Sequence, residues 1–145
     1  MKYLISACLM GENCKYNGGN NVNTRLMKYM QGKDYVLVCP EVLGGLPTPR
    51  ACAEIVGDKV MNTLHEDVSE AFHQGASKAL HLAQEEHIDV AILQSRSPSC
   101  GKGKRYSGNF DTTLVQGNGV FVDILEGHGY CVYDISEFLE KTDIK

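Results

Sequence analysis

The sequence predicts an α/β fold: a single domain with a mainly parallel central sheet flanked by helices. Short apolar runs alternate along the chain with segments of helical period, and this alternation is typical of βαβ units with parallel strands. Loops rich in Gly, Pro and Asn follow several of the apolar runs, and open α/β sheets bind ligands at the carboxyl ends of their strands. We therefore expect one domain, residues 1–145, with its active-site loops at that edge.

Composition and charge narrow the classes of protein to consider. Hydrophobic residues make up 43% and charged residues 22% of the chain, which is ordinary for a globular protein. The formal net charge is −4, so the chain lacks the excess of basic residues with which proteins bind nucleic acids and anionic membranes. No apolar run approaches the roughly 18 residues of a membrane span. We expect a cytoplasmic protein with no nucleic-acid or membrane partner, and the composition leaves its oligomeric state open.

Four short apolar runs are the candidate strands of the sheet. Each is bounded by loop residues and is too short for a helix. A further strand or hairpin arm is expected at residues 59–61. The four runs cover residues 2–7, 35–38, 89–93 and 130–133.

The most clearly patterned helix begins at Asp67. Asp67 as N-cap and Glu70 three residues later form a capping-box pattern. Apolar residues then recur at steps of three and four from Val68 to Ala83, which predicts a helix face packed on the sheet. Other helical segments are residues 24–30, with Leu26, Met27 and Met30 on one apolar face, residues 120–127, and a final amphipathic turn around Phe138 and Leu139.

Six cysteines are the unusual feature of the composition. In a cytosolic chain of this length, scattered cysteines favour metal or redox chemistry over a disulfide framework. Cys8, Cys39 and Cys100 follow three of the expected strands and have loop-forming or polar neighbours, so we expect their thiols to converge on one site. The alternative is a small buried apolar residue, which we expect of Cys131 because it lies inside a strand.

Two loops carry further candidate groups. Residues 39–50 contain three Pro and two Gly, a rigid loop suited to accurate placement of side chains such as Glu41. Glu41 is either a carboxylate of the site or a solvated loop residue. Residues 97–103 begin at Ser97 and lead into a basic cluster that either holds an anionic ligand or is solvated. The cluster consists of Lys102, Lys104 and Arg105.

Three thiolates without a fourth ligand suggest a metal or cluster with one open coordination position. Structural zinc sites normally have four ligands, often as Cys-x-x-Cys pairs, and this sequence contains no such pair. Iron–sulfur clusters are also held by Cys thiolates, and an iron without a protein ligand is a Lewis acid. The spacing of the cysteines alone leaves metal, redox and no chemistry open.

Five motifs occur in order along nearly the whole chain. They are CLMG at residues 8–11, KYNGG at 15–19, CPEVLGGLPTPR at 39–50, DVSEAF at 67–72 and SPSCG at 97–101. The set closely resembles the bacterial family catalogued as domain of unknown function 523, which includes the thiouracil desulfidases. The motifs at 39–50 and 97–101 are long enough to be specific.

The resemblance implies an enzyme that desulfurates a small thiolated base such as thiouracil without net redox change. It implies that Cys8, Cys39 and Cys100 hold a [4Fe-4S] cluster with one open iron. The substrate sulfur would pass to that iron while water replaces it on the ring carbon. By position, Glu41 is the candidate general acid/base, and Ser97 is the candidate hydrogen-bonding or proton-relay group.

Several positions depart from the family pattern. Lys15, Asn17 and Gln94 differ from its commoner residues, which bears on the choice of substrate more than on the metal site. Cys14 and Cys52 are additional cysteines, and Cys52 is either a substitute ligand or a buried thiol.

A non-catalytic protein that binds metal or senses redox state through its thiols is the alternative function. It would bind zinc or form a disulfide between two of the three site cysteines. A nucleotide-binding domain ranks last, because neither the Gly-x-Gly-x-x-Gly nor the P-loop pattern is present.

Overall fold

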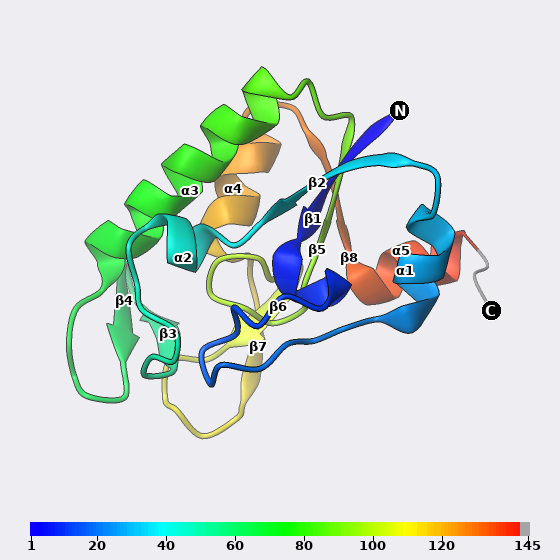
Figure 1. The fold of residues 1–145 in the computed structure, drawn as a ribbon. Coiled ribbons are helices and arrows are strands. Elements are labelled where there is room, and N and C mark those ends of the chain that lie inside the picture. The colour runs from blue at the N-terminus through cyan, green and yellow to red at the C-terminus, as the bar shows by residue number, and fades with distance from the viewer. Residues whose placement is uncertain (143–145) are drawn as a thin grey trace.

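The computed structural model describes residues 1–142 and has the α/β architecture that the sequence predicts. Its centre is a four-stranded sheet in the order β2-β1-β5-β8, in which every neighbouring pair is parallel (Figure 1). Each strand largely coincides with one of the four apolar runs of the sequence. Their bounds are β1 Lys2–Ser6, β2 Asp34–Val38, β5 Val90–Leu93 and β8 Cys131–Asp134.

Helices cover both faces of the sheet (Figure 1). Successive strand residues point to opposite faces, so Leu4 belongs to one buried apolar cluster and Ile5 to the other. One face of the sheet carries α3 (Ser69–Glu85) and α4 (Val120–Gly127), and the other carries α1 (Thr24–Met30) and α5 (Ile135–Lys141).

Among residues 1–142, no helix combines the length and apolarity that crossing a bilayer requires.

Helix α3 begins later than the sequence suggests. The preceding segment continues the neighbouring hairpin: Val68 N donates to Val60 O at 2.8 Å, and Val60 N donates to Ser69 Oγ at 2.8 Å. Asp67 accepts from Ser69 N but is not the N-cap, so the predicted capping box with Glu70 is wrong. The predicted apolar stripe is confirmed, because the buried residues of α3 are Phe72, Gly75, Ala76, Ala79 and Ala83.

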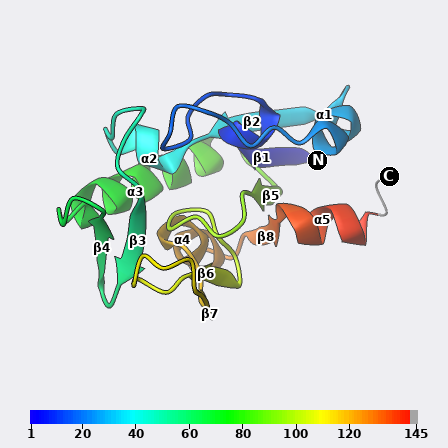
Figure 2. The ribbon, with the colours of Figure 1, turned by 90° about the horizontal axis from the view of Figure 1, so that it is seen from below.

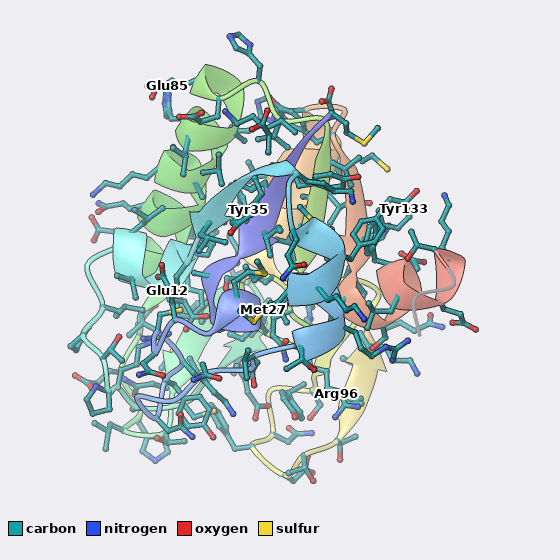
Figure 3. All side chains as sticks on the ribbon, turned by 45° about the vertical axis from the view of Figure 1, so that its right-hand side comes forward. Glu12, Met27, Tyr35, Glu85, Arg96 and Tyr133 are labelled. Carbon is teal, nitrogen blue, oxygen red and sulfur yellow. The ribbon has the colours of Figure 1, made fainter. Side chains whose placement is uncertain are left out.

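Helix α1 has the bounds that the sequence predicts. Asn23 Oδ1 accepts from Leu26 N at 2.9 Å and caps its first turn. Leu26 and Met30 are buried against the sheet, whereas Met27, labelled in Figure 3, is exposed. Met27 is one position from Leu26, a rotation of about 100° around the helix axis, which turns it away from the sheet.

Two antiparallel hairpins lie beyond the carboxyl ends of the central strands. Figure 2 shows them next to each other, and Gly108 N donates to Glu54 Oε1 at 2.9 Å between them. The sequence marks an arm of the first hairpin at residues 59–61, whereas the second, with strands of three residues, gives no recognisable pattern. The strands are β3 Ala53–Val56 with β4 Lys59–Asn62, and β6 Lys104–Tyr106 with β7 Leu114–Gln116.

A one-turn helix, α2 (Pro40–Leu43), follows β2 and packs closely on α3. Two glycines allow this approach. A Cβ atom at Gly75 would overlap the Pro40 carbonyl oxygen, and a Cβ atom at Gly44 would overlap the Ala71 carbonyl oxygen. The contact fixes the backbone directly after β2 to the long helix, and Cys39 and Glu41 lie on that backbone.

Cys131 is exposed, so the expectation that it is a buried apolar residue is wrong. It is the first residue of β8, which is an edge strand of the sheet. The next residue, Val132, is the one that enters the core. A cysteine at the open end of an edge strand has protein on fewer sides than one in a central strand.

Candidate active site

A cavity of about 690 Å³ lies at the carboxyl ends of β1, β2 and β5. The chain leaves β1 toward β2 on one side and later leaves β5 toward β8 on the other. This reversal makes the β1–β5 edge a topological switch point, where open α/β sheets form their binding crevices. The residues that line the cavity include Cys8, Cys39, Cys100, Glu41 and Ser97, the five that the sequence analysis singles out.

Cys8 lies in η1 (Ala7–Met10), the 3-10 turn that follows β1. The chain folds back over this turn, because Asn21 N donates to Cys8 O at 3.0 Å and Asn21 Nδ2 donates to Cys8 Sγ at 3.5 Å. A hydrogen bond from Cys14, reinforced by Asn21, lowers the pKa of Cys8 although burial opposes it. The thiol is therefore poised to ionise more readily than a free cysteine.

Cys39 is the N-cap residue of α2, directly after β2. A hydrogen bond from Cys14 lowers the pKa of Cys39 to about 7, against the effect of burial. The backbone N–H of Val42 and the charge of Arg50 act in the same direction as Cys14. A thiol with this pKa is partly ionised at neutral pH and is a good soft-metal ligand.

Cys14 lies between the two thiols just described. Hydrogen bonds with Cys39 and Cys8 raise the pKa of Cys14 well above its usual range. Cys14 is thus the protonated member of the trio and helps its two neighbours to ionise. Cys52 also lines the cavity, and burial raises the pKa of its thiol.

Cys100 is buried, in contrast to the other cavity thiols. It lies within a tight turn in which Gly101 N donates to Ser97 O at 2.9 Å, and a Cβ atom at residue 101 would lie only 2.7 Å from that oxygen. Burial raises the pKa of Cys100 to about 12, although hydrogen bonds with Ser6 and Ser99 oppose the shift. Since a metal binds the thiolate, metal binding at Cys100 must release a proton.

Glu41 is held on both carboxylate oxygens and is not a solvated loop residue. Arg50 Nε and Nη2 each lie 3.2 Å from Glu41 Oε1. On the other oxygen, Oε2, Ser99 Oγ donates at 2.9 Å, and Ser97 Oγ lies at 3.5 Å. The Glu41 and Arg50 side chains are only 15% and 7% exposed, so this ion pair is largely shielded from solvent.

Arg50 and Ser99 are site residues that the sequence analysis did not identify. Arg50 Nη1 donates to Pro47 O and Thr48 Oγ1, and Arg50 Nη2 donates to Cys14 O at 3.0 Å. Arg50 therefore ties the loop that carries Cys14 to the loop that carries Glu41. Both residues lie inside quoted motifs, but the sequence does not show which side chains they contact.

The basic residues after Cys100 do not face this site. Lys102 Nζ donates to Val132 O and lies 3.6 Å from a Glu126 carboxylate oxygen, and Arg105 Nη1 donates to Asn118 O. Neither these residues nor Lys104 is among the described residues that line the cavity. The cationic residues that do line the cavity are Lys15, Arg50 and Arg96, and Figure 3 labels Arg96 beside the β6–β7 hairpin.

The donor set, three thiols from the ends of adjacent strands, is of the chemical kind that holds an iron–sulfur cluster. Among residues 1–142, no group of three or more Cys, His, Asp or Glu side chains is arranged to hold one ion. A single zinc ion requires every ligand atom within about 2.3 Å of one point. A cluster distributes its thiolates over several irons and accepts wider spacing, and thiolates are its usual ligands. The volume of the cavity, about 690 Å³, is in the usual range for small-molecule binding sites.

The fold and the site are those of an α/β enzyme with a thiol-lined cavity at the switch point of its sheet. The profile of the family described as 2-thiouracil desulfurase matches residues 3–137, and the chain belongs to this family. This match confirms the resemblance drawn from the sequence motifs and the expectation of an enzyme.

Two relatives cover almost the whole chain. The uncharacterized protein YbbK of Bacillus subtilis (strain 168) is 38% identical over an alignment of 144 positions, which covers 92% of this chain and 95% of YbbK. The solved structure of the [4Fe-4S]-dependent thiouracil desulfidase TudS is 36% identical and superposes with a TM-score of 0.89, covering 96% of this chain and 93% of that chain. The similarity to TudS confirms the predicted fold class.

Proposed function

We propose that this chain removes sulfur from a small thiolated base such as 2-thiouracil, with a [4Fe-4S] cluster held by Cys8, Cys39 and Cys100. The observation that carries the proposal is that thiols from the ends of three adjacent strands line one cavity together with Glu41 and Ser97. The family of the chain and the printed description of TudS as a [4Fe-4S]-dependent thiouracil desulfidase support it.

The three cysteines would contribute differently to holding the cluster. Cys8 and Cys39 have lowered pKa values, that of Cys39 about 7, so both lose their protons more readily than a free thiol. Cys100, with its pKa raised by burial, would lose its proton only as it binds. When bound, a cluster with three protein ligands supplies an iron that can act as a Lewis acid toward a thiocarbonyl sulfur.

The reaction is a hydrolysis: a thiocarbonyl group and water give a carbonyl group and hydrogen sulfide, with no net transfer of electrons. Glu41 is the group that accepts a proton from the attacking water and returns it to the leaving sulfur. Arg50 is hydrogen-bonded to Glu41 Oε1, so the oxygen that accepts and returns the proton is Oε2, which faces Ser97 and Ser99. Ser97 Oγ accepts from Ser99 N and Cys100 N, both at 3.1 Å, and these donors stabilise negative charge on that oxygen.

Purification without oxygen tests the proposal. We expect a brown protein with about four irons per chain that converts 2-thiouracil to uracil and sulfide. The Cys100→Ser variant should lose both the iron and the activity. The Cys131→Ser variant is the matched control and should keep both, because Cys131 is exposed on β8.

Two results would contradict the proposal. One is a protein without iron after anaerobic purification and cluster reconstitution. The other is a fully loaded protein that releases no sulfide from any thiouracil isomer. Stoichiometric zinc in place of iron would favour the non-catalytic alternative.

A further inference from the structure

Ser99 is the most buried hydroxyl of the cavity wall, and nothing in the proposed reaction yet requires it. Its side chain is part of a residue only 1% exposed. Ser99 Oγ lies 2.9 Å from Glu41 Oε2, 2.9 Å from Ser97 Oγ and 3.6 Å from Cys100 Sγ. A buried hydroxyl in contact with all three candidate groups joins them physically.

The hydrogen bonds around Ser97 fix the direction in which its hydroxyl donates. Ser97 Oγ accepts from two backbone groups, Ser99 N and Cys100 N. These two donors fill its acceptor positions, so its one hydrogen must be donated elsewhere. Ser99 Oγ at 2.9 Å is within the usual range for O–H···O bonds, whereas Glu41 Oε2 at 3.5 Å is beyond it.

The same reasoning fixes the hydroxyl of Ser99. A carboxylate paired with an arginine only accepts hydrogen bonds, so Ser99 is the donor to Glu41 Oε2. Cys100 Sγ, at 3.6 Å, is the more distant and uncharged acceptor, so the single hydrogen of Ser99 goes to Glu41 and the Ser99 oxygen is free to accept from Ser97. The three side chains form a hydrogen-bonded series with one direction: Ser97 donates to Ser99, and Ser99 donates to Glu41.

We infer that Ser99 is a positioning residue that links Ser97 to Glu41, so that the two act as one unit. The inference rests on the proposed hydrolysis. As the attacking water replaces one of the two backbone donors at Ser97 Oγ and loses a proton to this oxygen, the Ser97 proton passes to Ser99 and the Ser99 proton passes to Glu41 Oε2. One O–H bond forms and one breaks at each serine oxygen, one breaks at the water and one forms at Glu41 Oε2, so that water and carboxylate become hydroxide and carboxylic acid.

The Ser99→Ala variant tests this role in the anaerobically purified enzyme. We expect kcat on 2-thiouracil to fall about 100-fold, as for the loss of a general acid–base group, with KM and iron content nearly unchanged. In a Ser97→Ala background, adding Ser99→Ala should lower kcat by less than about threefold, because the hydrogen-bonded series of side chains is already interrupted. The near-isosteric Ser99→Cys variant keeps a weaker donor and should have an intermediate kcat.

An infrared measurement on the purified chain gives a readout other than activity. The carboxylate band of Glu41, identified by its loss in Glu41→Gln, should shift in Ser99→Ala. It should stay in place in Ser107→Ala, which removes a loop hydroxyl that lies outside the cavity lining and accepts from Asn109 N.

The outcomes separate the two proposals. If the loaded wild-type enzyme releases no sulfide, the proposed function fails, and the infrared shift still tests the contact of Ser99 with Glu41. The positioning role is overturned if the wild type is active but Ser99→Ala keeps the wild-type kcat. It is also overturned if the double variant loses kcat by the product of the factors found for Ser97→Ala and Ser99→Ala alone. An unmoved infrared band overturns it as well.

Discussion

Five cysteines share one cavity, but their environments divide them into thiols that ionise and thiols that do not. Cys14 keeps its proton and lowers the pKa of Cys8 and Cys39 through hydrogen bonds. Burial has the opposite effect on Cys100. Their reactivity in the iron-free protein should follow this division, because the thiolate is the reactive form.

Cys39 is therefore expected to be alkylated at a rate that rises with pH and reaches half its maximum near pH 7. The sign follows from the lowered pKa: above about 7 the Cys39 thiolate predominates, and below it the thiol does. Cys100, with a pKa of about 12, should stay unmodified over the same range. Iodoacetamide labelling followed by peptide mass spectrometry measures both rates. Equal rates for Cys39 and Cys100 at pH 7 would contradict the assigned environments.

At the scale of single residues, sequence patterns identify which groups are reactive more readily than they identify which of these groups are in contact. The placement of Cys8, Cys39 and Cys100 after strands is enough to predict that they approach one another. The roles of Arg50 and Ser99 depend on which side chains meet across loops, and no spacing rule encodes that.

Among the secondary-structure elements, α2 is the one that connects the fold to the site. It carries Glu41, begins directly after Cys39 and is held against α3 by backbone contact at Gly44 and Gly75. The sequence indicates a rigid loop here, because three prolines and two glycines obscure a one-turn helix. The β6–β7 hairpin is missed for a related reason, since strands of three residues are too short for an alternating pattern.

The Gly75→Ala variant should move α2 and with it the site. Because the new Cβ atom would overlap the Pro40 carbonyl oxygen, we expect a loss of about 1–3 kcal/mol in the free energy of unfolding, together with reduced iron content. Urea denaturation and iron analysis measure the two effects. Gly127→Ala at the end of α4 is the control, because no atom lies within 4 Å of its added Cβ and its stability should change little. Equal behaviour of the two variants would show that the α2–α3 contact does not hold the site.

In the whole molecule, an apolar core is separate from the loops that carry the candidate site residues. Two apolar clusters, one on each face of the sheet, account for most of the buried residues. The four-stranded parallel sheet is the most predictable part of the molecule, because its strands are short apolar runs and the helices between them are periodic segments, and both patterns are visible in the local sequence. The cavity was predictable only as a convergence of strand ends, because its shape depends on two hairpins and a one-turn helix.

This separation predicts how the protein responds when the cluster is removed. The metal-free chain should keep its sheet, because the two apolar clusters include only one of the proposed ligands, Cys100. Hydrogen exchange should rise in residues 7–23, 39–52 and 97–103, whereas the amides of β1 and β5 should stay protected. Mass-spectrometric exchange before and after oxidative removal of the iron tests this. Loss of protection in β1 and β5 would mean that the cluster stabilises the entire fold, as a structural metal does in small domains, and that the thiols serve folding at least as much as catalysis.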